Sequence, residues 1–267
     1  GFYQLGLKKT CRKYTAFSTP IGKFQMKRIP MGIKNSPATF QRVADNIFAG
    51  LSPEHCLIYL DDIIVYGRNA KEHNFNLLKV LKAIKSNGIK LNPDKCNFLK
   101  TEINYLGHNI TSAGIFPDKQ KLQGLLSLPV PKNLKELQRF LGIVNFYADF
   151  IENSKLIEIP LRKLLRKKMK FEWGPEQDTA FNNLKNAIAS AKCLAHPDLN
   201  KEFILTTDGS ETGLGAILSQ IVDGKERPIG FKSRATTEEE KKRHKFRSHE
   251  FECLALIFGI DKFRHFL

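Results

Sequence analysis

The chain has 267 residues, of which 42% are hydrophobic, and its 43 basic and 27 acidic residues give a formal net charge of +16. This length predicts about two domains of roughly 150 residues each, and the charge predicts a polyanionic partner, with nucleic acid ahead of a membrane surface. No apolar run approaches the ~20 residues of a membrane-spanning helix, which argues against an integral membrane protein. The chain starts Gly-Phe-Tyr-Gln, without an initiator Met or a signal peptide, so we expect it to be a piece of a longer protein.

The five cysteines predict free thiols rather than disulfides. Their number is odd and none forms a Cys-x-x-Cys pair, which is typical of a reducing compartment. They are Cys11, Cys56, Cys96, Cys193 and Cys253. His244, His249 and Cys253 are close enough in sequence to suggest zinc, but they lack a fourth ligand, so ordinary side chains without a metal are the favoured interpretation.

The N-terminal part of the chain predicts short strands, a loop and a helix. Alternating apolar residues over 1–7 indicate the end of a strand, and residues 15–17 and 22–28 indicate two more strands joined by a turn at Pro20. A loop punctuated by Gly and Pro spans residues 30–37, where Ser36 and Pro37 are a candidate N-cap and first helical residue. The helix is predicted over about residues 38–48, with these residues facing inward: Phe40, Val43, Ile47 and Phe48.

Residues 57–66 are the most informative stretch. Two apolar, β-prone runs, 57–60 and 63–66, are separated only by Asp61 and Asp62, which is the spacing of a tight hairpin. Asp is a good turn former, which is the plainer interpretation. However, two carboxylates about 4 Å apart repel by roughly 4 kcal/mol at an effective dielectric near 20, and Asn-Gly or Asp-Gly would make a better turn. The pair therefore favours a Mg²⁺ site, because Mg²⁺ binds carboxylate oxygens together with substrate phosphates.

Residues 70–108 predict a helix and a second hairpin. The helix covers residues 70–86, with Gly88 as its C-cap candidate and an apolar stripe of Leu77, Leu78, Leu81 and Ile84. Residues 103–108 indicate a short hairpin. A sheet covered by helices on one side predicts an α+β fold.

From Pro117 onward the apolar spacing becomes helical. Two helices are predicted over about 122–126 and 134–146, separated by Pro129 and Pro131. A basic run follows, which fits a solvated face and a phosphate contact equally well. Its members are Arg162, Lys163, Arg166, Lys167, Lys168 and Lys170.

The last part of the chain predicts a further helix and then a new unit. The helix covers residues 173–189, and residues 195–198 form a linker. Strands are predicted over 203–206, 213–219 and 229–232, the first of them ending in Thr207-Asp208-Gly209-Ser210. Residues 239–267 end in a helix with these residues inside: Leu254, Ile257, Phe258, Ile260 and Phe263.

An ordered set of stretches resembles the Pol polyprotein of gypsy-type long-terminal-repeat retrotransposons over essentially the whole chain. Tyr59-Leu60-Asp61-Asp62 resembles the Tyr-x-Asp-Asp box of reverse transcriptases. Residues 30–41 resemble the nucleotide-pocket loop and its helix, residues 91–98 and 105–108 the end of the palm and the primer-gripping hairpin, residues 134–150 the thumb, and residues 206–220 the opening of a ribonuclease H domain. The box alone would be a weak signal, whereas the ordered set is specific.

The resemblance implies a reverse-transcriptase palm and helical thumb followed by an incomplete ribonuclease H-like α/β domain. The implied parts are residues 1–113 for the palm, 114–170 for a thumb-like region, 171–200 for a connecting helix and linker, and 201–267 for the start of the ribonuclease H-like domain. The implied activity is RNA-directed DNA polymerisation, in which a primer is extended on an RNA or DNA template by two-metal nucleotidyl transfer from deoxynucleoside triphosphates. The cofactor would be Mg²⁺, with Mn²⁺ as an alternative.

The resemblance assigns the polymerase residues. Asp61 carries over as a catalytic metal ligand and Asp62 as its neighbour in the same metal site, while a further Asp of the family would lie upstream of Gly1. Phe2 matches an aromatic gate that excludes a ribose 2′-hydroxyl; the plainer interpretation is apolar strand filler. The nucleotide pocket also includes Met31, which departs from the usual Phe, and Gly32. The residues implied to bind nucleic acid are Gln41, Arg42, Leu106, Gly107 and His108.

A second metal site is implied in the ribonuclease H-like part. Asp208, on a strand and followed by Gly-Ser, matches the first catalytic ligand, and Glu252 matches the second. Glu250 is the alternative, shifted by two residues onto a different helical face. The plainer interpretations are a strand-end turn for Asp208 and a solvated helix residue for either Glu. Two further Asp ligands of the family would lie beyond Leu267.

The expected partner is a primer–template duplex, such as an RNA–DNA hybrid, bound independently of sequence and with strong salt dependence. The resemblance implies a retroelement particle in the cytoplasm, or the nucleus, as the location. The alternative is a catalytically incomplete nucleic-acid-binding remnant of a decayed or co-opted retrotransposon. A basic structural or membrane-surface protein is supported by charge alone, because the basic residues do not form one amphipathic helix.

Overall fold

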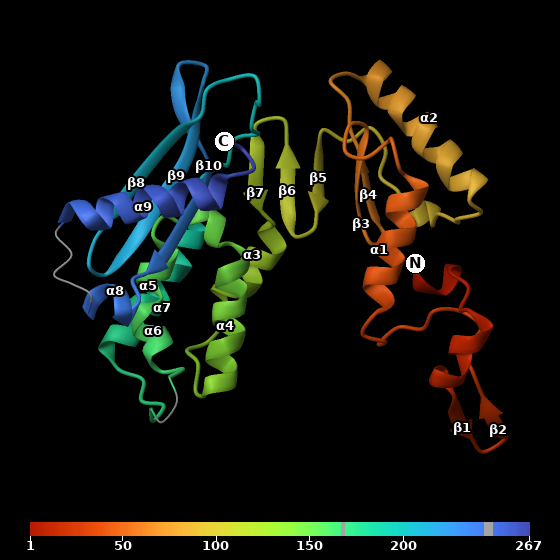
Figure 1. The fold of residues 1–267 in the computed structure, drawn as a ribbon, viewed down its shortest axis with the longest axis horizontal. Coiled ribbons are helices and arrows are strands. Elements are labelled where there is room, and N and C mark those ends of the chain that lie inside the picture. Colours follow the sequence, from red (N-terminus) through yellow and green to blue (C-terminus); the bar gives the residue numbers. More distant parts are fainter. Residues whose placement is uncertain (167–168, 243–247) are drawn as a thin grey trace. The chain divides into compact units, whose positions relative to one another are not determined.

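The computed structural model describes residues 1–166, 169–242 and 248–267, and of residues 241 and 242 the backbone alone. The chain divides into two compact units, Gly1–Lys100 and Thr101–Leu267 (Figure 1). None of the helices in the described part of the chain is long and apolar enough to span a bilayer.

The first unit begins with short elements. Two 3₁₀ helices, η1 (Phe2–Gln4) and η2 (Lys9–Thr15), precede a small antiparallel hairpin of β1 (Phe17–Thr19) and β2 (Gly22–Phe24). The strand expected over residues 1–7 is wrong, because only Gly6 finds a bridging partner, Arg28. The strands expected at 15–17 and 22–28 exist in shorter or shifted form.

Helix α1 (Ser36–Ile47) starts two residues earlier than expected. Asn35 is its N-cap, and the predicted cap Ser36 is instead the first helical residue, whose buried hydroxyl donates to Pro30 O at 3.1 Å. The helix buries Phe40 and Ala44, and Phe48 just beyond its end is also buried.

The core of the first unit lies between α1, a second hairpin and α2. The hairpin consists of β3 (Cys56–Tyr59) and β4 (Asp62–Val65), and α2 spans Ala70–Ser86 as predicted, with Gly88 at φ +66 after its end. The buried face of α2 differs in part from the predicted apolar stripe. Leu78 is 57% exposed, whereas Asn76 is buried and donates to Tyr66 O at 2.9 Å. The short 3₁₀ helix η3 (Pro93–Lys95) follows. The buried residues of this core are Ala44, Phe48, Cys56, Val80 and Ile84.

The second unit opens with a three-stranded antiparallel sheet and a helical region. The strands are β5 (Glu102–Tyr105), β6 (His108–Thr111) and β7 (Gly114–Pro117), the last of which the sequence did not predict. This sheet spans the expected palm boundary at 113/114, and the domain boundaries stay a prediction. The helices are α3 (Lys119–Leu126), α4 (Leu134–Phe146), η4 (Ala148–Phe150), α5 (Ser154–Ile157), α6 (Ile159–Lys163) and α7 (Pro175–Ala189).

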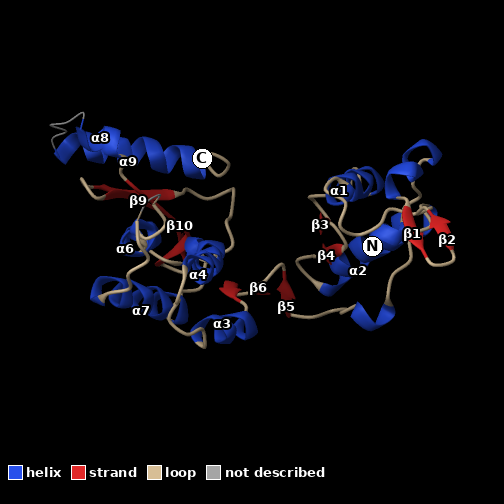
Figure 2. Ribbon diagram, turned by 90° about the horizontal axis from the view of Figure 1, so that it is seen from below, coloured by secondary structure: helices blue, strands red, loops and turns tan. Residues whose placement is uncertain are grey.

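A second antiparallel sheet follows, in the order β10-β9-β8. Its strands are β8 (Ile204–Gly209), β9 (Gly213–Val222) and β10 (Lys225–Ala235), and the chain ends with α8 (Glu238–Lys242) and α9 (Ser248–Phe263). Helix α9 lies along one face of the sheet and α4 and α6 lie on the other side (Figure 2). Helix α9 buries Phe258 and Phe263 as expected, but Ile257 is 64% and Ile260 47% exposed, so their inward assignment is wrong.

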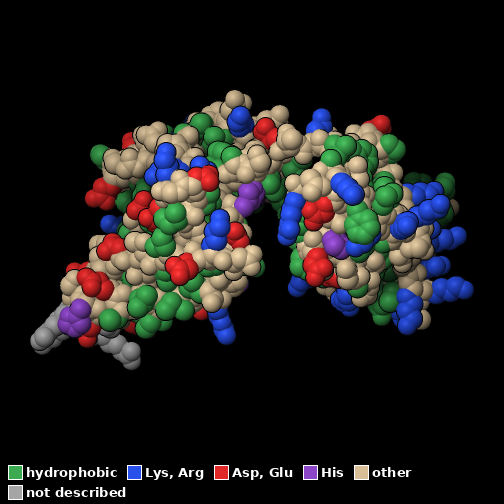
Figure 3. Space-filling model, turned by 90° about the horizontal axis from the view of Figure 1, so that it is seen from above, with side chains coloured by type: hydrophobic (Ala, Val, Ile, Leu, Met, Phe, Trp, Pro, Cys, Tyr) green, Lys and Arg blue, Asp and Glu red, His purple; other side chains and the backbone are tan. Residues whose placement is uncertain are grey.

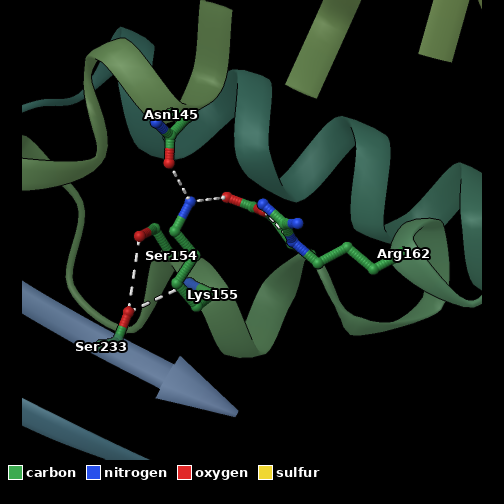
Figure 4. A network of polar contacts seen from close by, with 6 residues as sticks. Asn145, Ser154, Lys155, Arg162 and Ser233 are labelled. Carbon is green, nitrogen blue, oxygen red and sulfur yellow. Dashed lines mark hydrogen bonds and ion pairs between the residues drawn. The ribbon is translucent and has the colours of Figure 1, made fainter. Parts of the chain in front are cut away.

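A network of polar contacts around a buried carboxylate joins the helical region of the second unit to this sheet (Figure 4). Glu158 is fully buried and accepts from Lys155 Nζ at 2.8 Å and from Arg162 at 2.5 Å. Lys155 also donates through Nζ to Asn145 Oδ1 on α4 at 2.6 Å, and through its backbone N–H to Ser233 Oγ on β10 at 3.0 Å. Part of the predicted basic run thus has a structural role, and Lys167 and Lys168 lie outside the described residues.

Candidate functional site

The acidic hairpin of the first unit presents Asp61 at its tip. Tyr59 pairs with Asp62, so the turn residues are Leu60 and Asp61, one residue earlier than the Asp61–Asp62 turn predicted. Leu60 has φ +54, a left-handed conformation that costs a non-glycine residue about 1–2 kcal/mol. Asp61 and Asp62 are both exposed. The strain at Leu60 therefore lies directly beside the candidate metal ligand.

One side chain from α1 holds this turn. The Gln41 side-chain oxygen accepts the Leu60 N–H at 2.7 Å, and its Nε2 donates to Ile58 O at 3.2 Å and to Asp45 Oδ1 at 2.8 Å. Gln41 therefore holds the strained turn through both the oxygen and the nitrogen of its side-chain amide. The sequence did not reveal this brace, and the expected contact of Gln41 with nucleic acid stays a prediction.

The Asp61 carboxylate is half-exposed and pairs with the amino group of Gly1. Its side chain is 52% exposed, and Oδ2 lies 2.9 Å from the Gly1 nitrogen, which is a positively charged group in this chain. Carboxylate oxygens are the ligands Mg²⁺ prefers, so the donors fit the ion in kind. No group of three or more His, Cys, Asp or Glu residues suited to a metal occurs within the described ranges. The zinc candidate His244 lies outside the described residues.

The expected nucleotide-pocket residues lie on η1 and in the loop before α1. Phe2 is half-buried and packs edge-to-face on Phe40, with ring centroids 5.4 Å apart. It follows Gly1, so it is one residue away from the nitrogen that contacts Asp61. Met31 is 63% exposed and Gly32 has φ +86 in the loop before α1. The first unit therefore brings Phe2, Gln41, Asp61 and Asp62 together, while Arg42 is exposed on α1.

In the second unit, the β5–β6 turn is anchored to the helical region. Leu106 and Gly107 both have positive φ, as in a type I′ turn, and Leu106 is 37% exposed. The φ of +82 at Gly107 favours glycine, and a Cβ there would also lie 3.0 Å from the Phe146 ring and 2.8 Å from the flexible Lys121 Nζ. This packing fixes the hairpin that resembles a primer grip, and its nucleic-acid contact stays a prediction.

The His108 side chain is enclosed by aromatic rings. It stacks on Phe146 with centroids 5.0 Å apart and an interplanar angle of 8°, and on Phe150 at 5.6 Å. Burial is the main cause that lowers its pKa, and the charge of Lys121 adds to it, while Asp149 acts in the opposite direction. Its buried Nδ1 has no hydrogen-bond partner among the described residues. The neutral imidazole therefore works as a packing group.

The second acidic pair lies where β8 meets α9. A Cβ on Gly209 would collide with the Phe251 carbonyl and lie 3.0 Å from the Glu252 nitrogen, so the end of β8 touches the α9 backbone at this point. Asp208 precedes Gly209, and both Asp208 and Glu252 are exposed. The contact is with the peptide that joins Phe251 to Glu252, and the choice of Glu252 over the alternative, Glu250, stays a prediction. The two carboxylates are again the right kind of ligand for Mg²⁺.

Comparisons with known proteins bear on both ends of the chain. A family model described as reverse transcriptase (RNA-dependent DNA polymerase) matches residues 1–110, and one described as an RNase H-like domain found in reverse transcriptase matches residues 173–267. The retrovirus-related Pol polyprotein from transposon 297 of Drosophila melanogaster is 40% identical over 268 residues, covering 100% of this chain and 25% of the relative. The Tf2-3 polyprotein of Schizosaccharomyces pombe is 32% identical, covering 100% and 20%. The chain thus spans about a quarter or less of these relatives.

Solved structures share the fold. A foamy viral protease-reverse transcriptase dRH in complex with double-stranded DNA has a TM-score of 0.86 and 25% identity, over 100% of this chain and 46% of that chain. The foamy viral protease-reverse transcriptase in complex with an RNA/DNA hybrid has a TM-score of 0.83 and 24% identity, over 99% and 36%. The predicted α+β fold class is confirmed.

Proposed function

We propose a function from the premise that the chain belongs to the retroelement Pol polyproteins and carries their reverse transcriptase region and a ribonuclease H-like region. The longer polyprotein extends a primer on an RNA or DNA template by nucleotidyl transfer from deoxynucleoside triphosphates. The observation that carries this proposal is the exposed Asp61 at a strained turn that Gln41 braces.

The residues of the first unit have distinct tasks in this reaction. Bound divalent ions, Mg²⁺ or Mn²⁺, supply activation of the primer hydroxyl and neutralisation of phosphate charge. Asp61 and Asp62 would hold them, and Gln41 keeps Asp61 at the tip by fixing Leu60. Phe2, held edge-to-face on Phe40, limits the space for the sugar of the incoming nucleotide. Met31 and Gly32 line the same pocket, and Arg42 contacts the template.

The second unit contributes to substrate holding and to a second reaction. The rigid turn Leu106–Gly107, fastened through His108, positions the primer strand. Asp208 and Glu252 would hold divalent ions, which would supply the charge stabilisation needed to cleave the RNA strand of a hybrid. Glu252→Gln in the polyprotein should stop RNA cleavage and leave primer extension intact. Unchanged cleavage would move the role to Glu250 or elsewhere.

The test of the polymerase proposal is Asp61→Asn in the polyprotein that contains this chain. We expect loss of Mg²⁺-dependent primer extension with hybrid binding retained, because the substitution removes a charge and keeps the shape. Asp94→Asn, an exposed aspartate in η3, is the matched control and should extend normally. Retained extension in Asp61→Asn would refute the metal-ligand role. Hybrid binding without any extension by the unmodified polyprotein would favour the alternative, a non-catalytic nucleic-acid-binding remnant.

A further inference from the structure

The short helix η1 carries Phe2 of the proposed nucleotide pocket and lies beside the acidic turn. It spans only Phe2–Gln4, and none of its residues is buried. Phe2 packs on Phe40, and the nitrogen of the preceding Gly1 lies 2.9 Å from Asp61 Oδ2. A single helical turn fixes several backbone dihedrals for few hydrogen bonds, so it needs outside contacts to be stable. The position of Phe2 therefore depends on what else holds η1.

A cavity borders η1, so packing supports the helix little on that side. The cavity has a volume of about 370 Å³ and is lined by Gln4 and Leu5, by the C-terminal part of α1 and by residues 87–89. Side chains that face a cavity lack the contacts that would fix them on that side. Hydrogen bonds must therefore supply what packing does not.

Gln4 supplies two such hydrogen bonds through one side-chain amide. Its Nε2 donates to Lys90 O at 2.9 Å, and its Oε1 accepts the Lys90 N–H at 2.7 Å. An amide presents a donor and an acceptor side by side, which lets it pair with both backbone groups of one residue. Among residues 1–5, all of which the structure describes, Gln4 is the only one whose side chain forms a hydrogen bond.

Lys90 directly follows a well-fixed helix end. The Gly88 N–H donates to Lys85 O at 3.1 Å. The Ile89 N–H donates to Ile84 O at 3.1 Å, and the two bonds together form a Schellman motif at the end of α2. Ile89 also packs against the core of the first unit, which includes Ile84. Helix η1 is thus bonded to a part of the chain that the core holds in place.

One basic side chain adds a third hydrogen bond to η1. Lys and Arg side chains crowd one side of the first unit (Figure 3, right), and one of them, Arg28, donates through Nη1 to Gln4 O at 2.7 Å. Gln4 therefore joins η1 to two segments that lie 24 and 86 residues away in the sequence.

We propose that Gln4 is a positioning residue that sets how strictly the polymerase site rejects a ribonucleotide. By fixing η1, Gln4 fixes the ring of Phe2, which limits the space for the sugar. Rejection by a steric clash requires that the clashing group cannot move, so a ring free to shift would admit the extra 2′-hydroxyl. This inference rests on the proposed function.

The first experiment measures nucleotide selection by the polyprotein that contains this chain. Gln4→Met keeps the length of the side chain and removes both of its hydrogen bonds. We expect the ratio of kcat/KM for a deoxynucleoside triphosphate to that for the matching ribonucleotide to fall about ten-fold, through a lower KM for the ribonucleotide. A loss of folded protein would lower both values equally and cancel from the ratio. An unchanged ratio would overturn the inference.

The matched control is Gln177→Met in the second unit. Gln177 also joins two backbone groups, because its Oε1 accepts the Gly174 N–H at 3.1 Å and its Nε2 donates to Pro160 O at 3.4 Å. Its loss should leave the ratio unchanged. An equal fall in both variants would show that the effect is not specific to η1 and would refute the role of Gln4.

A double-mutant cycle tests whether Gln4 acts through Phe2. Phe2→Leu removes the ring and should itself lower the ratio. Adding Gln4→Met to Phe2→Leu should then change the ratio by less than about two-fold, because the two residues act as one unit. A further fall of about ten-fold, as expected for independent sites, would contradict the proposal.

Hydrogen exchange provides a readout that does not depend on activity. The Leu5 N–H donates to Phe2 O at 3.0 Å within η1, and in the polyprotein it should exchange about ten-fold faster in Gln4→Met. Unchanged exchange would mean that Gln4 does not hold η1. A polyprotein that adds no nucleotide would refute the proposed function together with this inference, whereas primer extension with an unchanged ratio would refute the inference alone.

Discussion

The two units use their charged residues in opposite ways. Residues 1–100 have 17 basic against 6 acidic residues, a net charge of +11, and no ion-paired Lys or Arg side chain. Residues 101–267 have 26 against 21, a net charge of +5, and pair their cations repeatedly, as Lys232 does with Asp149 at 2.7 Å and Arg234 with Glu240 at 2.7 Å. Charge in the second unit joins elements, whereas charge in the first is left for a partner.

The strongest test of this contrast is the buried carboxylate of the second unit. Glu158→Ala leaves Lys155 and Arg162 without their shared partner, and Lys155 is only 20% exposed. Because breaking a buried ion pair leaves an uncompensated charge, we expect a loss of roughly 3 kcal/mol in the free energy of unfolding. Arg162 is 47% exposed, which keeps the estimate at the low end. Urea denaturation of the chain measures it.

The control is Glu176→Ala, which removes the 3.9 Å pair with Lys163 at a position 73% exposed. It should cost under about 1 kcal/mol, as surface pairs do. Equal losses of unfolding free energy for the two substitutions would mean that the Glu158 network contributes no more to stability than a surface pair does.

In the first unit the polar contacts that matter structurally lie at the acidic turn. Gln41→Ala removes the acceptor of the Leu60 N–H and a donor to Ile58 O, so we expect about 2 kcal/mol lower stability at roughly 1 kcal/mol per hydrogen bond. Primer extension by the polyprotein should fall through kcat, because Asp61 loses its fixed position. Adding Leu60→Gly, which relieves the positive φ, should restore part of both losses. Lack of any rescue would show that Gln41 acts elsewhere.

These elements also show what could be predicted from sequence. Helix 70–86 and the hairpin over 57–66 follow from apolar periodicity. The acidic pair can be read directly, because Asp61 and Asp62 are neighbours in the sequence. The turn register was one residue off because the same two strands permit either turn. Gln41 decides between them from a helix 19 residues away, which no local pattern reveals. Helix α9 is apolar on most sides, so its sequence did not specify which side faces the sheet, and Ile257 and Ile260 were misassigned.

The second unit should also lose a smaller amount of stability as the pH falls. The pKa of His108 is lowered by burial, so the unfolded chain binds a proton more readily than the folded one. The stability that depends on neutral His108 is therefore present above the unfolded pKa of about 6.5 and is lost as pH falls below it, at up to about 1.4 kcal/mol per pH unit. His108→Phe keeps the stacking and should flatten urea stability between pH 7 and 5. His196→Phe, at an exposed position, is the control. An unchanged slope in His108→Phe would assign the acid sensitivity to another group.

The smallest expected effect compares the units directly within one chain. Unpaired lysines of the first unit repel one another, and salt screens that repulsion over a Debye length of about 10 Å at 0.1 M. Raising NaCl should therefore raise the free energy of opening for the amides of α1 and α2 by a few tenths of a kcal/mol, so that they exchange more slowly. Exchange in β9 and β10, beside the paired charges, should stay level or quicken slightly. Hydrogen exchange read by mass spectrometry resolves the two sets in one sample. If both sets respond alike, the unpaired charges of the first unit carry no repulsive cost, and the contrast drawn between the units does not hold.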